Sequence, residues 1–499
     1  MKPIVAFSFA MIFCSVGQRV HAHPAPVLEV DADILEDHLR GGMLAQVIGN
    51  LNGLPHEFKY IDSPGDVEHY TPSLPEGGYT DDDTDIEWVY LHEIVRTREI
   101  FLGAPQITAA WKRHINRGIF CSNLYARCLM NIGIEPPWTG NFALNPWADF
   151  NISGQFICES FGLMAPGMPQ TAAKLGLNYT HVAIDGEPAQ ATQLFTTMIA
   201  TACIVTDLNK ILDAGLAAVD PKSQIAGVVK TVRELHEKNP DDWRATRLEI
   251  KTRWQTHGGG MRDRNGYELN TACVIAALLY GHEDFTETLR NAFNFGYDAD
   301  CDAATAATIV GVMKGRRWMA EQGWNIKDVY RNSMRDDMPN DETLTSLENL
   351  VVEAARLTIQ KNGGEIPLPV REGPGEGSPR TQKRIYRIPT EQPANIEPLS
   401  TPADQLARAK KEFVPVLAHD LATPGIARAR AAYLAICLGE ADKLKADSPD
   451  AWSAAITELE KHPAVVHNIF AAPEPGSQSL KQAALAAGLH KPATATGKP

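Results

Sequence analysis

The sequence predicts an all-α protein, a compact multi-helix bundle followed by a small C-terminal helical module. Three observations support this prediction. Apolar residues recur at helical spacing along most of the chain, alternating patterns typical of β-strands are scarce, and a segment rich in proline and glycine separates two helical parts. With 499 residues, of which 44% are hydrophobic, the chain can bury a large core and is long enough for two or more domains.

The first 22 residues are predicted to be an export signal. Lys2 precedes the apolar run IVAFSFAMIFCSV, which is too short to span a bilayer, and residues 20 to 22 (VHA) resemble a signal-peptidase site. A lipoprotein signal through Cys14 is less favoured, because Phe13 stands where a small residue is needed. No later segment is long and apolar enough to span a membrane. We therefore expect a soluble mature protein outside the cytoplasm, periplasmic or extracellular.

Helical periodicity is clearest in three segments, residues 33–49, 269–281 and 344–359. In the last of these the apolar residues share one face of the expected helix. These segments, with the others between them, predict a helical bundle.

The composition along the chain predicts the domain boundaries. The bundle is expected over residues 31–362. Residues 363–403 are rich in proline and glycine and are predicted to be a linker without a packed core. Residues 404–470 predict the small helical module, and residues 471–499 a flexible tail.

The net charge of -14 argues against a nucleic acid as the main partner, because such partners require concentrated lysine and arginine. Divalent cations and small-molecule ligands fit this charge better. The cysteines outside the signal show no close CxxC pairing, so the sequence predicts neither a zinc site nor a disulfide framework. We expect a monomer.

Two acidic segments each run directly into an apolar helical pattern. Residues 80–85 read TDDDTD and residues 296–302 read GYDADCD, and both contain the spacing D-x-D-x-D. An EF-hand is excluded, because the required glycine and glutamate are replaced by Ile86 and His92 in the first segment and by Ala303 and Ile309 in the second.

Two interpretations of these segments remain open from the residues alone. They are either two unrelated acidic caps that favour the dipoles of their helices, or two halves of one cation site. In the second case hard divalent cations such as Mg²⁺ or Mn²⁺ would offset the repulsion among the carboxylates.

Residues 36–362 resemble the ADP-ribosylglycohydrolase family of all-helical hydrolases. Three motifs match in the family's order: RGGMLAQVIGNLNGLPHEF at 40–58, DDDTDIE at 81–87, and GYDADCDAATAATIVGVMKG at 296–315. The resemblance implies an ADP-ribosylglycohydrolase-like bundle. It also implies two Mg²⁺ ions, or Mn²⁺, that engage the hydroxyl groups of a ribose while a carboxylate activates water at the anomeric carbon.

Matched position by position, the resemblance implies catalytic roles for Glu57, Asp83 and Asp300. The candidate metal ligands are Asp81, Asp82, Asp83, Asp298, Asp300, Cys301 and Asp302. Asp85 is assigned to the helix rather than to the metals.

Three positions depart from the family pattern. Asp81 stands in place of a threonine ligand and adds charge, and Asn50 replaces an aspartate. Cys301 replaces a threonine and is a poor ligand for a hard cation, although Asp302 beside it could supply oxygen.

The segment 145–169 lies where the family binds its substrate. Within it Ser153, Gly154, Gln155 and Glu159 are the candidate substrate-binding residues, and an ordinary polar loop is the alternative. Trp138 and Trp147 could stack on a sugar or base, or simply be buried.

The sequence therefore predicts a metal-dependent glycoside hydrolase that cleaves an N- or O-glycosidic bond to ADP-ribose or a related ribose-like sugar. The expected substrate is a small glycoside or an ADP-ribosylated molecule. The alternative is a non-catalytic protein that uses the metals to bind a nucleotide sugar.

Overall fold

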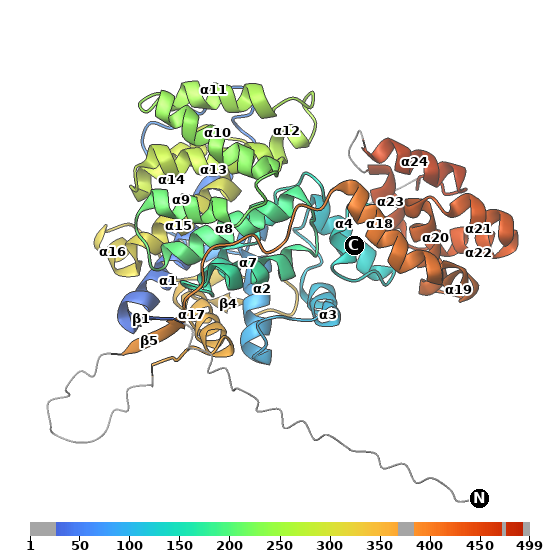
Figure 1. The fold of residues 1–499 in the computed structure, drawn as a ribbon, viewed down its shortest axis with the longest axis horizontal. Coiled ribbons are helices and arrows are strands. Elements are labelled where there is room, and N and C mark those ends of the chain that lie inside the picture. The colour runs from blue at the N-terminus through green and yellow to red at the C-terminus, as the bar shows by residue number, and fades with distance from the viewer. Residues whose placement is uncertain (1–25, 368–383, 472–475, 493–499) are drawn as a thin grey trace, which may run out of the picture.

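The computed structural model describes residues 26–367, 384–471 and 476–492. The predicted export signal at residues 1–22 lies outside this part of the chain. The protein is mostly helical, which confirms the predicted fold class (Figure 1). No helix in the described residues is long and apolar enough to cross a membrane.

The bundle contains helices α1 to α17. Their bounds are α1 (Ala32–Gly53), α2 (Asp82–Thr97), α3 (Ala104–His114), α4 (Cys121–Asn131), α5 (Ser153–Phe156), α6 (Glu159–Leu163), α7 (Pro169–Thr180), α8 (Glu187–Ala202), α9 (Leu208–Ala217), α10 (Gln224–Lys238), α11 (Trp243–Trp254), α12 (Arg262–Asn265), α13 (Tyr267–Gly281), α14 (Phe285–Phe295), α15 (Ala299–Lys314), α16 (Arg316–Glu321) and α17 (Leu344–Lys361).

Helices α1 and α15 pack closely at the centre of the bundle. Small residues make this approach possible, since a Cβ atom added at Gly41 would lie only 2.6 Å from the carbonyl oxygen of Gly311. Farther along α1, a Cβ at Gly53 would overlap the backbone of Asp300. The end of α1 is therefore held directly against the acidic start of α15.

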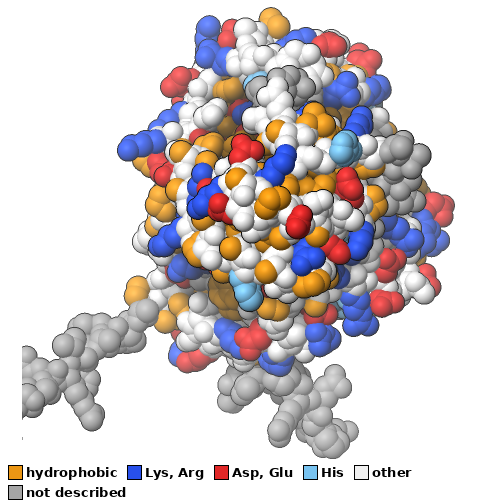
Figure 2. All heavy atoms as spheres, turned by 90° about the vertical axis from the view of Figure 1, so that its right-hand side faces the viewer, with side chains coloured by type: hydrophobic (Ala, Val, Ile, Leu, Met, Phe, Trp, Pro, Cys, Tyr) orange, Lys and Arg blue, Asp and Glu red, His pale blue; other side chains and the backbone are white. Residues whose placement is uncertain are grey.

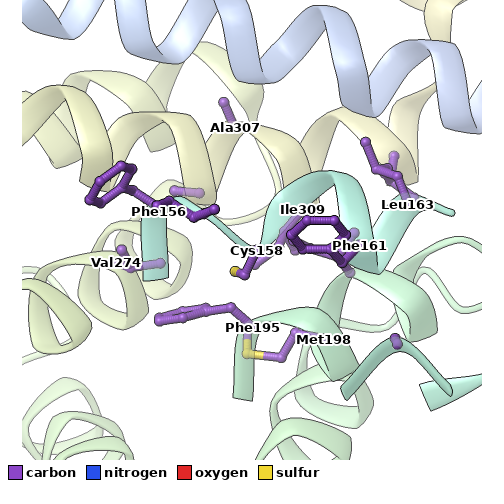
Figure 3. Close-up of a cluster of buried hydrophobic side chains, with 14 of the residues drawn as sticks. Phe156, Cys158, Phe161, Leu163, Phe195, Met198, Val274, Ala307 and Ile309 are labelled. Atoms are coloured by element: carbon purple, nitrogen blue, oxygen red, sulfur yellow. The ribbon is translucent and has the colours of Figure 1, made fainter. Parts of the chain in front are cut away.

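A layer of aromatic and aliphatic side chains supports α15 from behind. Figure 3 shows Phe156, Phe161, Phe195, Val274 and Ile309 meeting from α5, α6, α8, α13 and α15. All five are at most 5% exposed. Burying a side chain of this size contributes about 1.5–3 kcal/mol, so this layer holds α15 in place.

Two small sheets complete the bundle. In the first, β1 (Val27–Asp31) pairs antiparallel with β5 (Ile385–Pro389). In the second, β2 (Gly78–Tyr79), β3 (Tyr330–Arg331) and β4 (Asp341–Glu342) lie side by side, with β2 and β3 parallel. Because β2 ends just before the first acidic segment, this sheet fixes where α2 begins.

The prediction of a linker over residues 363–403 is wrong for its second half. Residues 385–389 form β5, in which Tyr386 and Ile388 are buried. The following residues cross the bundle along α8 to reach α18 (Figure 1). Side chains on α8 compensate for the lack of regular structure, since Gln190 and Gln193 each donate to the carbonyl oxygen of Glu397, both over 3.0 Å.

The C-terminal module consists of α18 (Pro402–Phe413), α19 (Leu417–Ala422), α20 (Ile426–Leu438), α21 (Ala441–Asp447), α22 (Pro449–Glu460), α23 (Pro463–Ala471) and α24 (Gly476–Ala486). It shares a hydrophobic cluster with α4 of the bundle. Tyr433 of α20 donates to the hydroxyl oxygen of Tyr125 on α4 over 3.1 Å. Figure 2 shows the outer side of the molecule in this region, where side chains of both charge signs alternate with hydrophobic ones.

The predicted flexible tail over residues 471–499 is wrong for the part that forms α24. Ala484, Ala487 and Leu489 are buried against the module, and Trp452 donates its indole N–H to the carbonyl oxygen of Ala487 over 3.0 Å. Alanine and leucine at helical spacing supply an apolar face that the module covers.

Candidate metal centre

The first acidic segment forms the start of α2. Asp81 is the N-cap residue, with extended backbone angles, and Asp82 and Asp83 lie in the first turn. The backbone N–H of Thr80 donates to the carbonyl oxygen of Arg331 over 2.9 Å, so the small sheet fixes the segment. Carboxylates at a helix N-terminus are favoured by the helix dipole.

The second acidic segment forms the start of α15. Asp298 is the N-cap residue, and Asp300 and Asp302 lie in the first turn. Gly296 precedes it with a φ of 76°, a region that favours glycine, and a Cβ there would overlap the carbonyl group of Tyr60. This turn directs the segment back toward the end of α1.

Glu57 reaches the same place from the end of α1. A short 3-10 turn, Leu54–His56, follows α1 directly. The backbone N–H of Phe58 then donates to the carbonyl oxygen of Tyr297 over 2.7 Å. This bond ties the residue after Glu57 to the residue before Asp298.

Asp300 belongs to two close groups of potential ligand atoms. One carboxylate oxygen from each of Glu57, Asp298 and Asp300 lies within 4.8 Å of the others. The same limit holds for Asp83, Asp300 and the sulfur of Cys301. The carboxylate of Asp300 therefore stands between two adjacent clusters, as a bridging ligand of a two-ion site would.

The carboxyl groups of this cluster raise one another's pKa values. Burial raises the pKa of Asp298 to about 8, and the charge of Glu57 adds to this effect. Burial and the charge of Asp300 raise the pKa of Asp83 well above its usual range. Burial and the charge of Asp298 do the same for Asp300. Glu57 also has a raised pKa, from burial and then from the charge of Asp81.

Hydrogen bonds offset only part of this repulsion. The side-chain nitrogen of Asn50 donates to Asp81 over 2.9 Å and to Asp83 over 2.8 Å. Asn265 donates to Asp298. The thiol of Cys301 donates to Asp83 over 2.7 Å.

The donor set fits hard divalent cations. Most of the groups that converge are carboxylates, and the buried oxygens Oδ1 of Asp300 and Oδ1 of Asn50 have no hydrogen-bond partner. Mg²⁺ and Mn²⁺ prefer such oxygen donors, and their charge would favour the ionised form of each carboxyl group. The sulfur of Cys301 does not suit these ions.

Asp85 has a different role from its neighbours. It forms an ion pair with Arg335 at 2.6 Å, and both side chains are fully buried. Arg335 also donates to the backbone oxygens of Arg117 and Gly118. The pair therefore joins the first turn of α2 to two distant segments, and Asp85 does not line the cavity above the acidic cluster.

A cavity of about 570 Å³ opens above the acidic cluster. Its wall contains six carboxylates, several aromatic and sulfur-containing side chains, and residues of α23 from the C-terminal module. The lining residues include Glu57, Asp81, Asp82, Asp83, Asp298, Asp300, Cys301, Phe120, Asn123, Trp147, Asn151, Ser153, Asn265, Met334, His467, Asn468 and Ala471. A volume of this size suits a small organic ligand.

Four of the sequence-predicted residues lie outside this wall. Gly154 packs against the backbone of Pro188, where it has no room for a side chain. Gln155 donates to Asp302 over 3.0 Å, and neither lines the cavity, so both lie behind the acidic cluster. Glu159 is buried and accepts from Thr305. Of the substrate-binding candidates only Ser153 lines the cavity, and Asp302 supports the cluster from behind.

The two tryptophans that could stack on a ligand, Trp138 and Trp147, lie in different parts of the structure. Trp147 is half-buried and lines the cavity. Trp138 packs edge-on against Phe413 of α18, with ring centroids 5.1 Å apart. It therefore helps to attach the C-terminal module to the bundle.

Several residues that line the cavity belong to no sequence pattern that would assign them to the site. Asn265 precedes α13 and lies more than thirty positions before the aspartate that it contacts, Asp298. Phe120, Met334 and the α23 residues follow no recognisable spacing. Only the tertiary arrangement brings them to the cavity.

Comparison with known proteins gives a matching family model and similar solved structures. Residues 31–358 match the family model described as ADP-ribosylglycohydrolase. A solved structure described as an ADP-ribosylglycohydrolase-related protein complex is similar at 15% sequence identity and a TM-score of 0.39, covering 65% of this chain and 99% of that chain. No curated protein matches the chain. The residues matched by the family contain both acidic segments and Glu57, but not the C-terminal module.

Proposed function

Since the chain belongs to the ADP-ribosylglycohydrolase family, we propose that it is a metal-dependent hydrolase that cleaves an N- or O-glycosidic bond to a ribose-like sugar. The observation that carries this proposal is the position of Asp300 between two groups of close ligand atoms at the floor of one cavity. An ordinary acidic helix cap does not need carboxylates from three distant segments.

The carboxylates would divide between holding cations and moving a proton. Asp82, Asp83, Asp298 and Asp300 would hold two Mg²⁺ or Mn²⁺ ions, which would fix the sugar hydroxyls and stabilise negative charge. Asn50 would keep Asp81 and Asp83 oriented through its two hydrogen bonds.

Glu57 is the best placed group to accept a proton from the attacking water. It lies on the cavity wall, is more exposed than the aspartates, and has a raised pKa because of burial and the charge of Asp81. A carboxylate with a raised pKa is a better proton acceptor than an ordinary one. Water attack at the anomeric carbon would break the glycosidic bond and release the sugar.

The test uses the purified protein with Mg²⁺ or Mn²⁺ and a panel of ADP-ribosylated peptides, ADP-ribose derivatives and furanosides. We expect sugar release that is lost on chelation and in Asp300→Asn. Asp62→Asn, on the surface next to Lys251, is the matched control and should retain activity. Absence of sugar release from every member of the panel, with metal bound, would refute the proposal.

A second candidate is a non-catalytic protein that binds a nucleotide sugar through the metals. Cys301 favours it, because its thiol bonds to Asp83 where an oxygen ligand would serve a hard cation better. Tight metal-dependent binding of a nucleotide sugar without turnover would identify this function.

We also propose that the protein is exported through residues 1–22. Fractionation of cells that express the full chain should place the processed protein outside the cytoplasm, and retention of the unprocessed chain in the cytoplasm would contradict export.

A further inference from the structure

We propose that the two ion positions of the candidate metal centre differ in chemistry, and that the position formed by Asp83, Asp300 and Cys301 takes Zn²⁺ with the cysteine sulfur as a ligand. The inference rests on the proposed function, because it names the metal of one position in the same site. Cys301 is the residue that sets the metal specificity, and the other position keeps Mg²⁺ or Mn²⁺.

The two positions offer different donor atoms. Each is a group of three residues whose ligand atoms lie within 4.8 Å of one another. Glu57, Asp298 and Asp300 offer oxygen only, whereas Asp83, Asp300 and Cys301 offer two oxygens and one sulfur. Mg²⁺ and Mn²⁺ prefer oxygen donors, and Zn²⁺ binds thiolate sulfur together with carboxylate oxygen. The sulfur therefore disfavours Mg²⁺ at one position and leaves the other position unchanged.

The thiol of Cys301 lies inside the acidic cluster. The side chains of Cys301, Asp83 and Asp300 are at most 6% exposed. The thiol donates to Oδ1 of Asp83 over 2.7 Å, and the first turn of α15 carries both Asp300 and Cys301. The buried oxygen Oδ1 of Asp300 has no hydrogen-bond partner. A cation shared by these groups would supply the partner that this oxygen lacks.

Three protein ligands on a cavity wall are the usual donor number of a catalytic zinc site. Such sites keep a fourth position for water or substrate. Asp83, Asp300 and Cys301 all line the cavity, which has room for that fourth ligand. Binding would break the S–H bond of Cys301 and form a bond between sulfur and zinc, and the proton would pass to the solvent.

A second cysteine in the same cavity provides an internal comparison. Cys121 begins α4 and lines the cavity, as Cys301 does. Its sulfur belongs to neither group of close ligand atoms around Asp300. The two thiols thus share one cavity, but only the thiol of Cys301 meets the carboxylate ligands.

The test uses the full chain, freed of metal with a chelator and then titrated with Co²⁺ as a stand-in for Zn²⁺. A bond between Co²⁺ and a thiolate absorbs in the near ultraviolet by charge transfer, and this band is missing when all ligands are oxygen. We expect about one equivalent of Co²⁺ per chain to produce the band, and about one equivalent of Zn²⁺ to remove it, because one position carries sulfur. An excess of Mg²⁺ should leave the band in place.

Three variants make the test decisive. Cys301→Ser should abolish the band and lower the ratio of Zn²⁺ affinity to Mg²⁺ affinity, measured by calorimetry, at least about tenfold. Cys121→Ser is the matched control and should keep both the band and the ratio. If Cys301→Ser fails to fold, Asp83→Asn retains the thiol but loses a neighbouring carboxylate, so it should need at least about tenfold more Co²⁺ for the same absorption.

The outcomes separate this inference from the proposed function, because the absorption does not require turnover. A band that depends on Cys301, without sugar release from the panel, would support the inference and refute the hydrolase. Sugar release by a protein that binds Co²⁺ without the band would overturn the inference and leave the hydrolase in place. A band that persists in folded Cys301→Ser, a band lost in Cys121→Ser, or an unchanged affinity ratio would also overturn the inference.

Discussion

The contact between His181 and Glu397 attaches the segment that leads to the C-terminal module, and its strength should depend on pH. Nε2 of His181 lies 2.9 Å from a carboxylate oxygen of Glu397, and the side chains are 16% and 31% exposed. Nδ1 of His181 lies 3.0 Å from the carbonyl oxygen of Ile184. Both ring nitrogens are thus placed to donate when the imidazole is charged.

The magnitude follows from the pKa of His181. Burial by itself lowers this pKa, but the hydrogen bond and the charge of Glu397 outweigh burial and raise it from 6.5 to about 9. An increase of this size corresponds to about 3 kcal/mol of stability. Because the pKa is higher in the folded protein, this stability is fully present below pH 6.5 and is lost as the pH rises through about 9.

The assay compares the unmodified protein with Glu397→Gln by urea denaturation at pH 6 and at pH 10. We expect the free energy of unfolding of Glu397→Gln to be lower than that of the unmodified protein by about 3 kcal/mol at pH 6 and by less than about 1 kcal/mol at pH 10. Glu29→Gln is the control, because Glu29 pairs with Arg387 on the surface and such pairs contribute little. A difference for Glu397→Gln that is equal at both pH values would refute the reasoning.

Three other predictions concern the candidate metal centre and its support. Asp298→Asn with Asp300→Asn should abolish Mg²⁺ binding, measured by calorimetry, since both ligand groups lose carboxylates; retained binding would place the ions elsewhere. Cys301→Thr should tighten Mg²⁺ binding several-fold because oxygen replaces sulfur, and an unchanged affinity would remove Cys301 from the site. Gly49→Ala should destabilise the fold by about 1–3 kcal/mol in urea denaturation, because its Cβ would overlap the carbonyl group of Ala303 on α15; a neutral effect would show that α1 and α15 can separate without cost.

Local chemistry made the helical class and the two acidic segments readable from the sequence. Apolar residues at helical spacing report which side of a helix is buried, whatever it is buried against. Aspartates at a helix start repel one another within a few residues, so residues 80–85 and 296–302 stand out without a structure. The match of residues 31–358 to the family confirms the resemblance that these segments carried.

Tertiary structure alone decided what surrounds the acidic cluster. Gln155 and Asp302 come together behind the cluster, because α5 packs against α15 and turns Ser153, but not Gln155, toward the cavity. Arg335 pairs with Asp85 across 250 positions, a contact that no local spacing encodes.

The structure of the C-terminal part of the chain also depends on tertiary contacts that local sequence patterns do not encode. Residues 385–389 form a strand because β1 pairs with their backbone groups, and residues 476–486 form a helix whose apolar side is covered by the rest of the module. The placement of Asn468 in the cavity wall depends on how α23 docks on α4. The sequence by itself determined which residues carry the charge of this protein. The packing of distant helices decided which of these residues share a site, because contacts between side chains of remote segments depend on the whole fold and not on the adjacent residues in the chain.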